Sequence, residues 1–288
     1  MLAVPKNPCN GFYNRNPGTP DAMTQRFCSC CGAPILQAAF KKTRTISVSK
    51  DTFIIPPADY SLIMLKKVIA AFLYILVFLV LLFLLAGDWD WREGWVFTIW
   101  FLVLCYTVIM YLYRKDPALL AERYRTPGTG NQEPRDRSIV YGIVALFIVW
   151  IAIMPLDARR YGWSPAFPLW LEFFGVALLC GSFFFFFRSY ADNTFLSPLV
   201  RIQDERKQTV VSTGVYALVR HPMYLGGVLM FLGTPLLLGS VCGIIAGLAL
   251  TLLLIARIPG EESLLSHELE GYGDYCKKVR FRLVPFIW

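Results

Sequence analysis

The stretch LKKVIAAFLYILVFLVLLFLLA, residues 65–86, decides the fold, because every residue after its two lysines is apolar or aromatic. At 1.5 Å per residue, a helix over this run is about long enough to cross a hydrocarbon core of roughly 30 Å. Three further runs have the same character, at 94–113, 139–155 and 166–187. Of the 288 residues, 56% are hydrophobic and 17% are charged, which is typical of an integral membrane protein.

Two shorter apolar runs follow at 224–239 and 240–256, separated only by a Gly-Ser step. They predict a tight helical hairpin that crosses the membrane and returns. We therefore expect an all-α membrane protein with about six transmembrane helices. Gly239, Gly243 and Gly247 recur at a spacing of four and are expected on one helix face, where another backbone can approach closely.

The distribution of lysine and arginine predicts the orientation in the membrane. The segments 41–67, 114–137, 188–220 and 257–288 hold 6, 6, 5 and 5 of these residues, whereas the intervening loops hold only Arg92, Arg159 and Arg160. Six crossings then place both termini in the cytoplasm, and the segments around 203–226 and 257–288 on the same side. Topology and anionic lipid headgroups explain the net charge of +8, so no nucleic-acid partner is needed.

The first 60 residues do not share this pattern. They carry Pro, Gly, Asn and Thr in irregular order, which indicates a mobile extension. The chain then divides into N-terminal transmembrane helices (61–187) and a more polar C-terminal region (188–288), where we expect the catalytic region. Cysteines occur there at Cys9, Cys28, Cys30 and Cys31, with a single C-x-x-C. Because the second knuckle of a zinc ribbon is missing, we expect reduced thiols and no metal site.

Polar residues gather in three segments of the C-terminal third. QDERKQTVVSTGVYALVRHPMYLG spans 203–226, RIPGEE spans 257–262, and GYGDYCKKVRFRLVPFIW spans 271–288. The first lies between two apolar segments, the second follows the next pair of apolar runs, and the third comes after the second. The predicted topology puts all three on one side of the membrane. The sequence therefore predicts one cytosolic site built from all three.

These segments carry a resemblance to a known family. TGVYALVRHPMYLGG, R-x-x-x-EE and GYxxYxxxVxxRLxPFIW resemble the isoprenylcysteine carboxyl methyltransferases and their relatives among the phospholipid methyltransferases. The resemblance covers residues 190–288, and DWDWREGW and RKDPALLAERY are more loosely similar to bacterial members. It implies a membrane enzyme that takes S-adenosylmethionine from the cytosol and a lipophilic or prenylated acceptor from the lipid bilayer.

The resemblance also implies site residues. The family's substrate-contacting arginine falls on Arg257, and Arg206-Lys207 stands where many bacterial relatives have a glycine. The family's cofactor positions fall on Gln203, Gln208, Thr209, Val210, Val211, Tyr216, His221, Pro222, Met223, Tyr224 and Glu261.

The chemistry of S-adenosylmethionine explains these residue types. Its ammonium needs an acid, its carboxylate needs donors and its adenine needs a planar apolar surface. Glu261 could bind the ammonium, and Arg220 with free backbone N–H groups could bind the carboxylate. Tyr216 or Tyr224 could supply the surface for the adenine. Glu262, paired with Glu261, favours the cationic methyl donor over a dinucleotide, whose phosphates two carboxylates would repel.

Two residues are predicted to be catalytic. Arg257 is expected to hold the acceptor carboxylate and Glu261 to hold the donor. Methyl transfer to a carboxylate needs positioning and exclusion of water more than a strong base, because the acceptor is already ionised. Pro222 suits the first position of a helix, whose N-terminal end favours an anion.

Other interpretations remain open at this point. His221 could only cap a helix, Glu261 and Glu262 could begin a separate cytosolic helix, and Arg257 could be a snorkelling boundary residue. The acceptor could instead be a phospholipid amine. A sterol-type membrane reductase has a similar His-Pro step and C-terminal pattern and binds NADPH, and a non-catalytic protein could keep the same fold.

Overall fold

The computed structural model describes residues 26–27, 34–35, 57–128 and 131–288. The chain divides into two compact units, Met1–Thr45 and Ile46–Trp288. In the first unit, β1 (Arg26–Phe27) pairs antiparallel with β2 (Pro34–Ile35). The expectations of an irregular extension and of reduced thiols at Cys9, Cys28, Cys30 and Cys31 concern residues outside the described ones.

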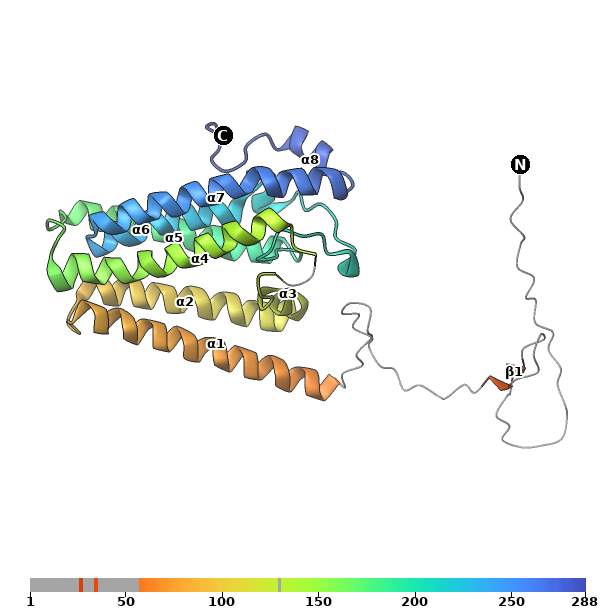
Figure 1. Cartoon of the computed structure of the whole chain (residues 1–288), viewed down its shortest axis with the longest axis horizontal. Helices are drawn as coiled ribbons and strands as arrows, with labels where there is room; N and C mark the ends of the chain where they lie inside the picture. The colour runs from red at the N-terminus through yellow and green to blue at the C-terminus, as the bar shows by residue number, and fades with distance from the viewer. Residues whose placement is uncertain (1–25, 28–33, 36–56, 129–130) are drawn as a thin grey trace. The chain divides into compact units, whose positions relative to one another are not determined.

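The regular elements among the described residues of the second unit are all helices, and its long helices lie side by side (Figure 1). An all-α fold is thus confirmed for this unit. Its elements are α1 (Pro57–Ala86), α2 (Arg92–Lys115), α3 (Pro117–Arg123), α4 (Pro134–Pro155), the π-helical turn η1 (Leu156–Tyr161), α5 (Leu169–Asp192), the 3₁₀ turns η2 (Asp204–Arg206) and η3 (Gly214–Ala217), α6 (Pro222–Leu238), α7 (Val241–Glu268) and α8 (Tyr272–Lys278).

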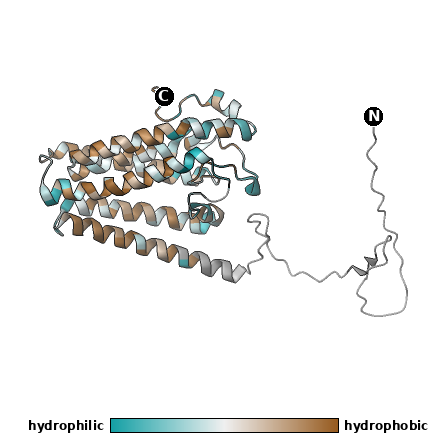
Figure 2. Ribbon diagram, in the orientation of Figure 1, coloured by the Kyte–Doolittle hydropathy of each residue, from teal (hydrophilic) through white to brown (hydrophobic). Residues whose placement is uncertain are grey.

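Five helices in the described part of the chain are long and apolar enough to cross a membrane. Four are α1, α2, α5 and α7, and the fifth is α4 continued by η1. Figure 2 shows hydrophobic residues along the middle of these helices and hydrophilic residues gathered at their ends. The sixth apolar helix, α6, has 17 residues and is about 25 Å long.

The sequence explains the boundary between α6 and α7. Pro222 occupies the first turn of α6, where a missing N–H costs nothing, and Gly239 ends the helix in the left-handed region at φ +75°. Ser240 then caps α7, because its Oγ accepts a hydrogen bond of 2.8 Å from the N–H of Gly243. Two residues therefore join the two helices.

Close packing at glycine is confirmed for two of the three predicted positions. A Cβ on Gly247 would lie 2.3 Å from Phe231 O, and one on Gly243 would lie 2.5 Å from Met154 Cγ. Gly239 was wrongly placed on the same face, because it terminates α6 and a Cβ there would meet nothing within 4 Å. The glycines of α7 thus bring α4 and α6 close to it.

The last long helix extends well beyond the apolar run 240–256. α7 continues through Pro259 to Glu268, so the interpretation that Glu261 and Glu262 begin a separate cytosolic helix is wrong. Arg257 and Glu261 are four residues apart and lie on the same face of this helix. The polar end of α7 is therefore a rigid platform.

Candidate functional site

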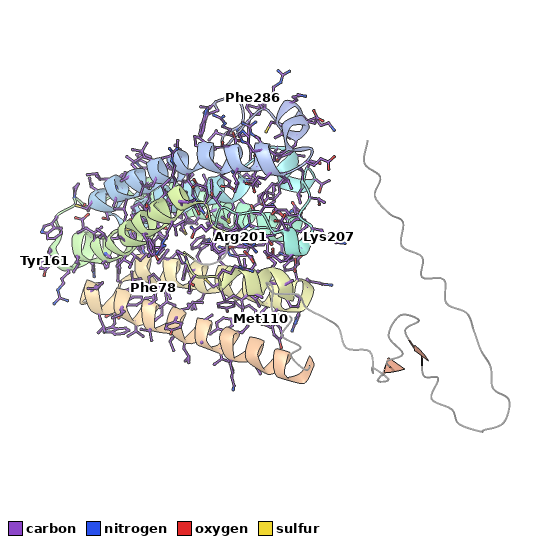
Figure 3. All side chains as sticks on the ribbon, turned by 45° about the vertical axis from the view of Figure 1, so that its right-hand side comes forward. Phe78, Met110, Tyr161, Arg201, Lys207 and Phe286 are labelled. Atoms are coloured by element: carbon purple, nitrogen blue, oxygen red, sulfur yellow. The ribbon has the colours of Figure 1, made fainter. Side chains whose placement is uncertain are left out.

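A cleft with about 850 Å³ of empty space, partly open to solvent, lies at the end of the bundle where α6 begins and α7 ends. Its walls come from three segments: 193–201, 208–224 and 261–275. Figure 3 shows Arg201 and Lys207 at this end and Tyr161 at the opposite end of the helices.

Most of the predicted cofactor residues meet in this cleft. Gln203 and Glu262 do not line it, and neither does Arg257, the predicted acceptor residue. Eleven do: Gln208, Thr209, Val210, Val211, Tyr216, Arg220, His221, Pro222, Met223, Tyr224 and Glu261. The fold therefore brings these eleven residues together, and their role in binding the cofactor stays a prediction.

Glu261 offers a carboxylate to the cleft. Its Oε2 accepts a hydrogen bond of 2.5 Å from the hydroxyl of Tyr224, which fixes the carboxylate, while Oε1 accepts none from the residues that the structure describes. The side chain is half-buried, so an approaching cation would meet a partly desolvated charge. Glu261 can therefore bind an ammonium group through Oε1.

His221 stands at the entrance to α6 without capping it. It occupies the N-cap position, but its side chain makes no capping hydrogen bond. Its ring stacks on that of Tyr224, with centroids 5.4 Å apart and an angle of 10° between the planes. Its Nε2 lies 3.2 Å from Oε1 of Glu262. The helix-cap interpretation of this side chain is thus not supported.

Glu262 is buried behind the cleft wall and contacts three basic side chains. Its Oε2 accepts a hydrogen bond of 2.9 Å from Arg282 Nε, and its Oε1 lies 2.8 Å from Arg220 Nε without the alignment of a hydrogen bond. Together with His221, these residues join α7, the His-Pro loop and the C-terminal tail. Glu262 organises the wall from behind.

The C-terminal tail completes the wall through its main chain. The N–H groups of Arg220 and His221 donate to the carbonyls of Phe281 and Arg282, at 3.0 and 2.9 Å. The sequence predicted that free backbone N–H groups accompany Arg220 in the site, and the N–H groups of these two residues are not free. Tyr275, from α8, donates a hydrogen bond of 2.7 Å to Tyr216 O.

Arg257 does not line the cleft, and it makes a buried pairing that the sequence did not reveal. Its Nε and Nη2 donate to Asp136 at 2.6 and 3.2 Å, and Nη2 also donates to Pro198 O at 2.8 Å. Its guanidinium carbon lies 5.8 Å from the centre of the Tyr224 ring. Arg257 is only 7% exposed, which argues against a snorkelling residue.

Asp136 also holds the cleft wall directly. Its Oδ2 accepts a hydrogen bond of 2.9 Å from the N–H of Val200, and Val200 O accepts one of 3.1 Å from Glu133. In the sequence Asp136 is one of several charged residues after Pro134, and only its place in the first turn of a helix distinguishes it. A long-range partner such as Arg257 leaves no local signal.

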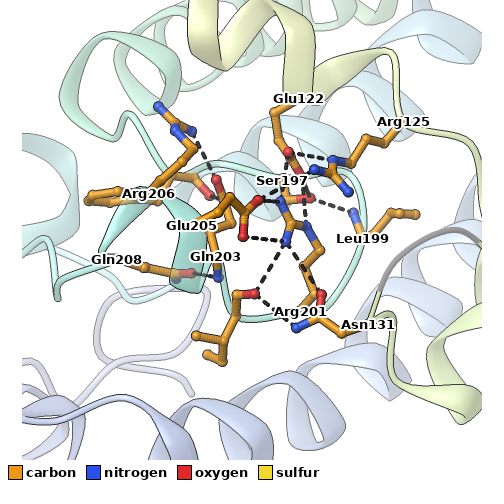
Figure 4. Close-up of polar contacts among 12 residues, drawn as sticks. Glu122, Arg125, Asn131, Ser197, Leu199, Arg201, Gln203, Glu205, Arg206 and Gln208 are labelled. Carbon is orange, nitrogen blue, oxygen red and sulfur yellow. Dashed lines mark hydrogen bonds and ion pairs between the residues drawn. The ribbon is translucent and has the colours of Figure 1, made fainter. Parts of the chain in front are cut away.

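A second buried ion pair holds the same wall, as Figure 4 shows. Arg201 donates to both oxygens of Glu122, at 2.9 and 2.8 Å, and to Glu205. Glu122 comes from α3 and also accepts from the hydroxyl of Ser197, at 2.8 Å. Burial raises the pKa of Glu122, whereas the hydrogen bonds from Arg201 and Ser197 lower it. The lowering effects are together larger, so the pKa of Glu122 lies below its ordinary value.

Gln203 braces the loop beneath the cleft. It is fully buried, and its side chain donates to Phe195 O at 2.5 Å and accepts from Arg206 at 2.9 Å. Its N–H donates to the side chain of Gln208 at 2.9 Å. Lys207 adopts the left-handed region at φ +51°, which favours glycine.

The remaining lining combines phenols with apolar side chains. Burial raises the pKa of Tyr216 and of Tyr275, so both phenols stay protonated at neutral pH. The last turns of α7 and the segment after it add the apolar side chains of Leu264, Leu265 and Leu269. The cleft thus combines the carboxylate of Glu261 and the cationic side chains of Arg201 and Arg220 with aromatic and aliphatic walls.

Most of the cleft lining lies in a stretch of the chain that is similar to a methyltransferase family. Residues 170–271 match the phospholipid methyltransferase family. The chain is 32% identical over 133 residues to the protein-S-isoprenylcysteine O-methyltransferase of Mus musculus, covering 46% of this chain and 44% of that protein. It is 38% identical over 85 residues to the enzyme of that name in Schizosaccharomyces pombe, covering 29% and 36%.

A probable protein-S-isoprenylcysteine O-methyltransferase of Oryza sativa subsp. indica is 36% identical over 94 residues, covering 31% of this chain and 47% of that protein. The matched stretches span less than half the length of these curated relatives. Asp136 and Glu122 lie outside the residues that match the family, although they hold the wall of the cleft. In its C-terminal half, the chain is similar to the phospholipid methyltransferases and to the protein-S-isoprenylcysteine O-methyltransferases, as its motifs predict.

Proposed function

We propose that this chain is an S-adenosylmethionine-dependent membrane methyltransferase whose acceptor is the carboxylate of an isoprenylcysteine-like compound. One observation carries the proposal. Within the segment that matches the methyltransferase family, eleven motif residues surround one cleft, and Glu261 presents a half-buried carboxylate there beside aromatic rings. The full activity of the curated relatives comes to this chain only as part of this proposal.

The donor fits the charges of the cleft. We assign the ammonium of S-adenosylmethionine to Glu261, whose Oε2 is already held by Tyr224. The adenine ring would lie on the neutral tyrosine and leucine surface, and Arg220 would face the carboxylate of the donor. The bound donor carries the methyl group on a sulfonium. The sulfur then leaves as a neutral thioether. Glu262 acts behind the wall by orienting His221 and Arg220.

The acceptor would approach from the apolar side. In the transfer, a bond forms between the acceptor oxygen and the methyl carbon while the carbon–sulfur bond breaks and its electron pair passes to sulfur. Arg257 is the residue we assign to the acceptor carboxylate. Its Nη1 makes no hydrogen bond with the described residues, whereas its other nitrogens are fixed by Asp136 and Pro198. A fixed guanidinium contributes through orientation.

The finer topology belongs to the same proposal. We infer that α6 crosses as a sixth span and forms a hairpin with α7, that both termini are cytoplasmic, and that the cleft opens to the cytosol. The lysine and arginine asymmetry supports this arrangement. A methyl donor would then come from water and a prenylated acceptor from the bilayer. We also keep the division into 1–60, 61–187 and 188–288 as a proposal.

A phospholipid amine is the second candidate acceptor, because the family that matches residues 170–271 is named for phospholipids. The curated relatives that match this chain carry the isoprenylcysteine name, which favours the carboxylate acceptor. The reductase alternative has less support, since Glu261 would repel the phosphates of NADPH.

Equilibrium binding separates these classes. Purified protein in nanodiscs is titrated by calorimetry with S-adenosylmethionine and with NADPH, and we expect binding of the first only. Transfer of a labelled methyl group to a small prenylcysteine analogue and to phosphatidylethanolamine then identifies the acceptor. Binding of NADPH without S-adenosylmethionine would contradict the proposal. Binding of neither would favour a non-catalytic protein.

A further inference from the structure

An exposed apolar corner lies in the C-terminal tail, outside the cleft. Phe286 and Ile287 are 90% and 80% exposed, the highest values among the exposed large hydrophobic residues that the structure describes. Figure 3 shows Phe286 projecting away from the helices. Two neighbouring apolar side chains with this exposure indicate a surface that something covers.

The corner is built and is not a frayed end. The N–H groups of Ile287 and Trp288 both donate to Val284 O at 3.2 Å, and Trp288 O accepts from the N–H of Arg282 at 2.9 Å. Phe286 adopts a left-handed φ of +67°, which is unfavourable for a residue with a Cβ. Leu283, next to this turn, is 3% exposed and belongs to the main core. The fold thus holds these two side chains outward.

A basic hollow with about 510 Å³ of space, largely open to solvent, lies against this corner. Its lining residues are Arg220, Arg280, Phe281, Arg282, Ile287 and Trp288. Glu262 faces Arg220 and Arg282, at 2.8 and 2.9 Å, whereas Arg280 is exposed and makes no ion pair with any described residue. The hollow therefore places the charge of Arg280 beside the apolar surface of Phe286 and Ile287.

The position of the hollow fits the surface of a membrane. Arg220 lies two residues before α6, an apolar helix, and Leu283 packs on the core of the membrane helices. The hollow is therefore at the level where apolar helices give way to polar loops. At this level a phospholipid presents a phosphate above its acyl chains, which matches the order of charge and apolar surface in the hollow.

We propose that this hollow binds an anionic phospholipid of the bilayer surface, with the headgroup phosphate at Arg280 and the acyl region against Phe286 and Ile287. This lipid site is separate from the acceptor site, and it does not rest on methyl transfer. Because Phe281 O and Arg282 O accept hydrogen bonds from Arg220 and His221, a lipid that holds the tail also supports the His-Pro loop.

The insertion of the corner is tested with a fluorescent label on a single cysteine at position 286, in a full-length chain with its own cysteines replaced. Nanodiscs contain phosphatidylcholine alone or with phosphatidylglycerol, and brominated acyl chains quench labels that reach them. We expect strong quenching at 286. A label at Lys207, on an exposed loop at the same end of the bundle, is the control and should be quenched little. Equal quenching at both positions would overturn the proposal.

The headgroup contact is tested with short-chain phosphatidylglycerol titrated onto the protein in neutral micelles. Arg280→Gln should weaken this binding about fivefold, the usual effect of one cation near an anionic surface. Lys278→Gln removes the same charge from a nearby exposed residue outside the hollow, and should change binding little. Equal losses would indicate general attraction only and would overturn the site.

A second copy of the chain is the competing occupant of the corner. Quenching at 286 that falls as the protein is concentrated in the nanodisc would indicate such a copy, and would contradict the lipid site. Quenching that is independent of protein concentration supports it.

Discussion

Arg257 and Asp136 are joined by two hydrogen bonds, of 2.6 and 3.2 Å, although 121 positions separate them in the sequence. Both side chains are buried, at 7% and 3% exposure. The pair connects the end of α7 to the first turn of α4, and Asp136 also holds Val200 in the cleft wall. The residue that we assign to the acceptor is therefore oriented by a carboxylate from outside the residues that match the phospholipid methyltransferase family.

Removing the charge of Asp136 should destabilise the protein and uncouple Arg257. We expect Asp136→Asn to lower the free energy of unfolding by about 3–5 kcal/mol, because a buried arginine loses its ionic partner. Thermal unfolding in detergent measures this loss. Adding Arg257→Gln removes the second charge and should restore part of the stability. A double variant that is less stable than Asp136→Asn alone would contradict the pairing.

The two sides of the site should separate in kinetics. Arg257→Ala is expected to leave the affinity for S-adenosylmethionine nearly intact and to cut turnover severely, since orientation can contribute up to about 7–11 kcal/mol. His221→Ala should first raise the donor concentration needed for half-maximal rate. Calorimetry and methyl-transfer assays on both variants measure this. If Arg257→Ala abolished donor binding as fully as His221→Ala, Arg257 would belong to the donor pocket.

Glu261→Gln should weaken binding of S-adenosylmethionine by roughly ten- to a hundredfold. A charge-assisted hydrogen bond of this kind contributes about 1.5–3 kcal/mol, and the amide lacks the charge. Calorimetric titration gives the dissociation constant. Glu268→Gln, at the exposed end of the same helix, is the control and should bind as the wild type does. Unchanged affinity in a folded Glu261→Gln variant would remove this residue from the donor site.

Labels should place the two halves of the site on one side of the membrane. Single cysteines at Lys207 and Arg280, and a third near residue 130, are expected to react with an impermeant reagent from the cytosol. A cysteine at Tyr161, at the opposite end of the bundle, should react only from the other side. Opposite reactivities at 207 and 280 would eliminate a shared cytosolic site.

Acid should loosen the wall that Glu122 and Arg201 hold. The pKa of Glu122 is lowered in the folded protein, so its ionised form stabilises the fold above its ordinary pKa of 4.5, and this contribution is lost as the pH falls below that value. Glu122→Gln should therefore be less stable at neutral pH and lose less stability on acidification. Glu270→Gln, an exposed control, should follow the wild type. Unfolding measured against pH distinguishes the two.

Local signals account for what the sequence predicted well. Apolar runs located the long helices, and Pro222 and Gly239 marked the ends of α6. The motif residues from Gln208 to Tyr224 gather because they follow one another along a single loop and helix start. The end of α7 was missed, because Pro259 reads as a helix breaker and yet lies inside the helix.

Long-range pairings account for what the sequence could not supply. Asp136 and Glu122 look like ordinary charges in polar connections, and only the folded chain reveals that Arg257 and Arg201 neutralise them. Gln203 was assigned to the cofactor by its place in a motif, whereas its contacts with Phe195 and Arg206 depend on the path of the loop. Spacing alone carries no information on such partners.

The hydrogen bonds from Arg220 and His221 to Phe281 and Arg282 also impose an order on biosynthesis. A ribosome adds residues from the N-terminus onward. Arg220 and His221 are therefore made about 60 residues before the tail segment that accepts their hydrogen bonds. Until that tail segment emerges from the ribosome, the N–H groups of Arg220 and His221 lack these main-chain acceptors. A nascent chain that stalls before Phe281 would therefore carry every helix from α1 to α8 and still lack a braced site.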